Sequence, residues 1–75
     1  MSEKRKSIIV AVTDGFLPKI NDLANSLRKE GMLIDRVFPI LGVITGEVLS
    51  ENIEKIKSIQ GVLNVEDDLE MKATA

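Results

Sequence analysis

Two kinds of hydrophobic spacing follow one another along the chain, and together they predict strands and helices in turn. The continuous β-branched run from Ser7 to Thr13 is typical of a central strand. After Asp14-Gly15, apolar residues recur every three or four positions, which predicts a helix with Pro18 in its first turn and a stop at Gly31. The buried face of that helix is expected to consist of Ile20, Leu23, Ala24 and Leu27.

The next segment predicts two strands joined by a turn at Gly42. The first runs from Met32 to Leu41 and contains Pro39, which cannot donate to a ladder, so this strand should lie at an edge or end near the proline. The second spans Val43–Leu49. Its two faces should carry Ile44 and Val48 on one side and Thr45 and Glu47 on the other.

A second helix and a last strand complete the pattern. Ser50 is expected to cap the helix, and Glu51 to pair with Lys55 one turn later. Gly61 should end the helix, and Val62–Glu66 should form a short strand. The buried stripe of this helix is expected to be Ile53, Ile56 and Ile59.

The resulting order, βαββαβ, predicts an α+β fold, a ferredoxin-like sandwich. Right-handed crossovers give a four-stranded antiparallel sheet of order 4-1-3-2, with two helices on one face and the other face open to solvent or to a partner. A basic N-terminal tail is expected at 1–6, a single domain at 7–68 and an extended C-terminal tail at 69–75.

Composition narrows the function. The 75 residues include no His, Cys, Trp or Tyr, and the net charge is −2. No thiolate, imidazole or fixed carboxylate pair is available, so we expect a protein that is not an enzyme and binds no metal or cofactor. Few aromatics and an acidic balance argue against nucleic acid. The apolar run Ile8–Val12 is too short for a signal sequence or a membrane span, which favours a cytoplasmic protein without membrane contact.

Two features leave room for a binding role. Asp14-Gly15 could belong to a ligand site at the dimer interface of an amino-acid-sensing (ACT-like) module, or could simply form a turn. The acidic residues Asp67, Asp68 and Glu70 read as a solvated end rather than a cation site. The tail beyond them could be captured as an added strand by another protein, or could be an unstructured terminus.

Four segments in sequence resemble the subtilisin-propeptide inhibitor family, which includes protease propeptides and stand-alone inhibitors such as the fungal inhibitor of proteinase B. They are Ile34–Phe38, Gly42–Val48, Ser50–Ile56 and Gly61–Asp68. The resemblance implies a sheet face that lies on two surface helices of the protease, with Glu66 and Asp68 capping the N-termini of those helices. It also implies a tail that lies in the substrate cleft, with Thr74 in the primary specificity pocket and Met71 in an apolar subsite. The implied cleft-binding residues are Leu69, Glu70, Met71, Lys72, Ala73 and Thr74.

We therefore expect a non-catalytic inhibitor or folding helper of a subtilisin-like serine protease, monomeric when free. The alternative is a small regulatory or ligand-binding ACT-like module that acts as a homodimer.

Overall fold

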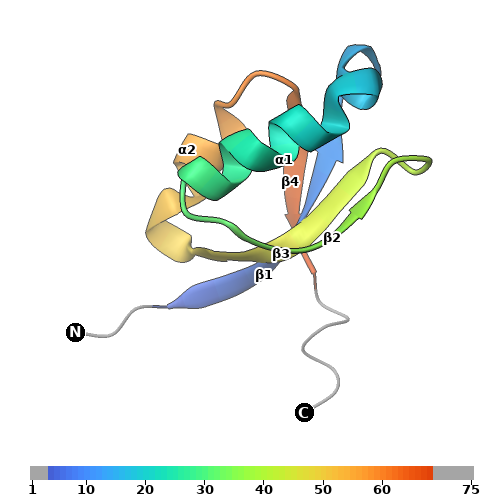
Figure 1. Cartoon of the computed structure of the whole chain (residues 1–75). Helices are drawn as coiled ribbons and strands as arrows, with labels where there is room; N and C mark the ends of the chain where they lie inside the picture. Colours follow the sequence, from blue (N-terminus) through green and yellow to red (C-terminus); the bar gives the residue numbers. More distant parts are fainter. Residues whose placement is uncertain (1–3, 69–75) are drawn as a thin grey trace.

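The computed structural model describes residues 4–68, which form one antiparallel sheet and the helices that cover it (Figure 1). The elements are β1 (Arg5–Val12), the 3-10 helix η1 (Asp14–Lys19), α1 (Ile20–Lys29), β2 (Leu33–Phe38), β3 (Val43–Leu49), the 3-10 helix η2 (Ser50–Asn52), α2 (Ile53–Lys57) and β4 (Val62–Asp67). In this part of the chain no helix is long and apolar enough to cross a membrane.

The sheet has the strand order β2-β3-β1-β4, and all three pairings are antiparallel. Read from the other edge, this is the predicted order 4-1-3-2. Strand β2 lies at an edge and ends at Phe38, directly before Pro39, because proline has no N–H for the ladder. The sequence therefore predicted the α+β class and the strand arrangement correctly.

The core lies between the sheet and the helices, which both cover the same face in Figure 1. Alternation along β1 and β3 directs every second side chain into this layer, as predicted for Ile44 and Val48. The predicted face of α1 is buried in full. The buried residues are Ile8, Val10, Val12, Ile20, Leu23, Ala24, Leu27, Met32, Ile44, Val48 and Ile56.

Gly31 follows the end of α1, as predicted, whereas α2 already ends at Lys57, so Gly61 lies in the turn before β4 and is not the predicted helix stop. Gly31 has a φ of 98°, and Gly61 has a φ of 103°. Residues that have a β-carbon rarely adopt this left-handed backbone conformation. At Gly61 a β-carbon would also lie 2.7 Å from the ring of Phe16, so the glycine lets η1 pack closely against the turn before β4.

The start of the domain differs from the sequence prediction. Strand β1 begins at Arg5, so Arg5 and Lys6 belong to the sheet rather than to a basic tail. Lys6 is half-buried and lies 3.8 Å from the carboxylate of Asp67. Pro18 lies within η1 rather than in α1. This 3-10 segment brings Phe16 and Leu17 against the core before the α-helix begins.

The second helix also differs. Within the described part of the chain the Ser50 side chain makes no capping bond, and Ser50 is instead the first residue of η2. Its backbone N–H donates to the Lys4 carbonyl at 2.8 Å and so continues the β1–β3 ladder. Among residues 4–68 the ion pair on this helix joins Glu54 to Lys57 at 3.6 Å, not Glu51 to Lys55. Of the predicted stripe, only Ile56 is fully buried. The flanking Ile53 and Ile59 are half-buried against the core.

Candidate functional site

The sheet face opposite the helices, here called the open face, is arranged in three rows that cross all four strands. The strand registers define each row, because directly paired residues point to the same side of a sheet. In the order β2, β3, β1, β4, the rows are Phe38-Val43-Ala11-Asn64, Arg36-Thr45-Ile9-Glu66 and Leu33-Glu47-Ser7-Asp68.

The open face changes from apolar to acidic along the strands. The first row is apolar on three strands, and it adjoins the β2–β3 turn, where Ile40 is 96% exposed and Leu41 72% exposed. The third row carries two carboxylates, Glu47 and Asp68. An apolar end and an acidic end on one face provide a surface that can both bury area and orient a partner.

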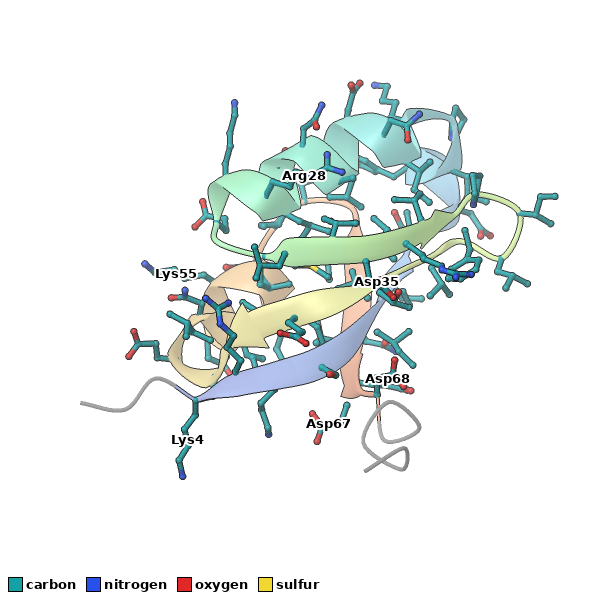
Figure 2. The ribbon with its side chains drawn as sticks, turned by 60° about the horizontal axis from the view of Figure 1, so that its bottom comes forward. Lys4, Arg28, Asp35, Lys55, Asp67 and Asp68 are labelled. Carbon is teal, nitrogen blue, oxygen red and sulfur yellow. The ribbon has the colours of Figure 1, made fainter. Side chains whose placement is uncertain are left out.

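The acidic residues at the end of β4 (Figure 2) divide between the two faces. Glu66 lies opposite Ile9 on the open face. The Asp68 N–H donates to the Ser7 carbonyl at 2.8 Å, which extends the ladder and places Asp68 on the same face. Asp67 lies between them and points to the helix side, where it meets Lys6. The two predicted capping residues, Glu66 and Asp68, therefore lie on the same face of the sheet, and Asp67 lies on the opposite face.

Glu66 and Asp68 are available to a partner. Glu66 is exposed and Asp68 is half-buried. Within residues 4–68, neither carboxylate takes part in an ion pair or a side-chain hydrogen bond. Both can accept bonds from N–H groups of another molecule without first losing an internal contact.

The predicted cleft-binding residues lie outside the described part of the chain. They are Leu69, Glu70, Met71, Lys72, Ala73 and Thr74. Their proposed role therefore stays a prediction from the sequence.

The residues of the ACT-like alternative do not join the open face. Asp14 and Gly15 begin η1, which follows β1, and both are exposed. A β-carbon on Gly15 would meet nothing within 4 Å. The turn is held by the Thr13 N–H, which donates to the Gly61 carbonyl at 2.9 Å. The ligand-binding role of this loop also stays a prediction.

The apolar row of the open face was missed by sequence reasoning. Phe38, Val43 and Ala11 come from three strands, and only the pairing register shows that they are neighbours. The alternation of β3 could have placed Val43 on this face with Thr45. It could not have aligned Phe38 with Val43, because that register is set by the turn between the two strands, where the Gly42 N–H donates to the Phe38 carbonyl.

No protein-family model, curated protein or solved structure matches this chain. The functional hypothesis therefore rests on the geometry of the open face and on the resemblance seen in the sequence.

Proposed function

We propose that this protein is a non-catalytic inhibitor, or folding helper, of a subtilisin-like serine protease. The observation that carries the proposal is the shared placement of Glu66 and Asp68 on the helix-free face, with Asp67 on the other side. The resemblance requires this alternation, since two caps two residues apart can serve one partner surface only if the segment is extended. The order of elements, a ferredoxin-like sandwich, is the one that the resemblance implies.

The open face would bind the protease by two complementary contacts. Carboxylates at helix N-termini accept bonds from N–H groups that lack partners and interact favourably with the helix dipole. The apolar row of Phe38, Val43 and Ala11 would cover apolar side chains on the same pair of helices. The acidic end thus orients the complex, and the apolar end adds buried area.

Inhibition itself is assigned to residues 69–74. Strand β4 ends at the acidic end of the open face, next to the proposed protease contact, and the residues assigned to the cleft follow it in the sequence. The resemblance assigns Thr74 to the primary specificity pocket and Met71 to an apolar subsite. An extended segment held in this way adds main-chain hydrogen bonds to side-chain selectivity. The same binding energy would favour the folded protease over its unfolded state, which is the folding-helper role.

An inhibition assay with subtilisin tests this proposal. We expect micromolar or tighter inhibition by the full chain, and loss of at least about 100-fold in affinity when Met71–Ala75 are deleted, because subsite contacts are removed while β4 stays intact. Cleavage of a chromogenic peptide gives the inhibition constant. Mass spectrometry confirms the intact C-terminus.

Deletion of Ser2 and Glu3 is the matched control, since β1 begins only at Arg5 and the sheet is untouched. It should leave the inhibition constant unchanged. No inhibition by the intact, folded chain at micromolar concentration would contradict the proposal, as would full inhibition by the chain that lacks Met71–Ala75.

A further inference from the structure

Strand β2 forms the edge of the sheet farthest from β4, and it contains a bulge that makes it self-complementary. The register passes from Ile34 opposite Gly46 to Arg36 opposite Thr45, so Asp35 is an extra residue. In a regular strand Leu33 and Phe38 would point to opposite faces. Because of the extra residue, both lie on the open face, while Ile34 and Val37 both face the helices.

We propose that two copies of this chain pair through their β2 edges, antiparallel about a two-fold axis between Asp35 and Arg36. In this register the apolar residues of β2 meet residues from the same side of the sheet. Leu33 pairs with Phe38 of the second copy, and Ile34 pairs with Val37. Asp35 and Arg36 form two opposite-charge pairs at the centre, because the symmetry repeats every contact.

The exposed groups of β2 suit this pairing. Asp35, which Figure 2 shows on β2, and Arg36 are both exposed, and neither forms an ion pair within residues 4–68. Leu33 is 56% exposed. A shallow hollow of about 270 Å³ opens beside it, lined by Leu33, Ile34, Asp35, Gly46 and Glu47. Phe38 of the second copy, opposite Leu33, would cover the edge of this hollow.

The charges and the bulge of β2 also disfavour pairing with strands of other proteins. A charged, bulged edge normally deters pairing with foreign chains, because a regular strand leaves the bulge unmatched and the charges unpaired. A second copy supplies both a matching bulge and the opposite charges. One strand pair buries less than a stable interface of about 1,200 Å² or more, so the dimer should be weak and concentration-dependent. In dilute solution the chain remains the monomer expected of a free inhibitor.

Sedimentation of the full chain from micromolar to millimolar concentration tests the pairing. We expect a reversible monomer–dimer equilibrium. The single reversals Asp35→Arg and Arg36→Asp should each weaken it by about tenfold or more, because like charges then face each other at the centre. The double swap Asp35→Arg with Arg36→Asp should restore it. Lys55→Glu, an exposed reversal on α2, is the control and should change nothing.

Circular dichroism verifies that each variant is folded. Restored dimerisation in the double swap shows that the single reversals act on strand pairing and not through a loss of fold. A chain that stays monomeric at all concentrations would overturn the proposal, and so would a dimer that the single reversals leave intact or that the double swap fails to restore. Protease inhibition depends on the open face and the C-terminal segment rather than on β2 pairing, so either proposal can fail without the other.

Discussion

Replacing Gly46 with alanine is expected to destabilise the folded protein strongly. Gly46 is buried in β3, between Ile8 of β1 and Ile34 of β2. A β-carbon there would lie 2.3 Å from the Leu33 carbonyl oxygen and 3.0 Å from the Ile34 α-carbon. Both are backbone atoms of the paired strand, so the overlap can be relieved only by moving β2 away.

We expect a loss of about 3 kcal/mol or more, at the upper end of overpacking costs. A domain of this length has a total stability of only about 4–11 kcal/mol. Urea unfolding followed by circular dichroism measures the change. The melting temperature should fall by more than about 12 °C.

Gly15→Ala is the matched control, because a β-carbon at Gly15 meets nothing within 4 Å. Its stability should change by at most about 1 kcal/mol. Equal unfolding midpoints for the two alanine variants would show that the close approach of β2 to β3 does not constrain the fold.

The parts of the fold that the sequence predicted correctly are those governed by regular spacing. The period of α1 placed Ile20, Leu23, Ala24 and Leu27 in the core, and the alternation of β3 separated Ile44 and Val48 from Thr45 and Glu47. In both elements one face is buried and the other is not, so the hydrophobic pattern fits only one assignment of the buried face.

The errors arose where contacts between distant parts of the chain, rather than residue type, set the local conformation. Ser50 has the residue type of a helix cap, but its N–H extends the ladder to the Lys4 carbonyl. Pro18 is suited to a first helical turn, but the packing of Phe16 against Gly61 extends the preceding segment as a 3-10 helix. Tertiary contacts decided both cases, and local sequence does not contain them.

Part of the candidate site was also predictable from regular spacing. Glu66 and Asp68 are two residues apart at the end of a strand, so alternation alone places them on one face. The rest of the open face depends on how the strands are aligned, and at Leu33 on the register shift near Asp35. Such a shift has no dependable signature in a single sequence, and it moves the residues beyond it to the other face.

Charge reversal at Glu66 or Asp68 is expected to reduce protease inhibition far more than the same change at Asp67. Each reversal removes a cap, worth about 0.5–2 kcal/mol. It also places a cation at the positive end of a helix, which costs about 0.3–1 kcal/mol more. Glu66→Lys and Asp68→Lys should therefore each weaken inhibition about 10-fold, and the double variant at least about 100-fold.

Asp67→Lys provides a control with the same change in net charge. Its side chain lies on the helix side, where the 3.8 Å contact with Lys6 is half-exposed and contributes less than about 1 kcal/mol. If the open face caps protease helices, this variant should inhibit within about threefold of the original, since only long-range attraction changes. Assays at low and high salt separate the two effects, because screening removes the long-range attraction and leaves direct caps largely intact. Equal losses for all three reversals, abolished at high salt, would mean that the acidic end attracts the protease without capping its helices.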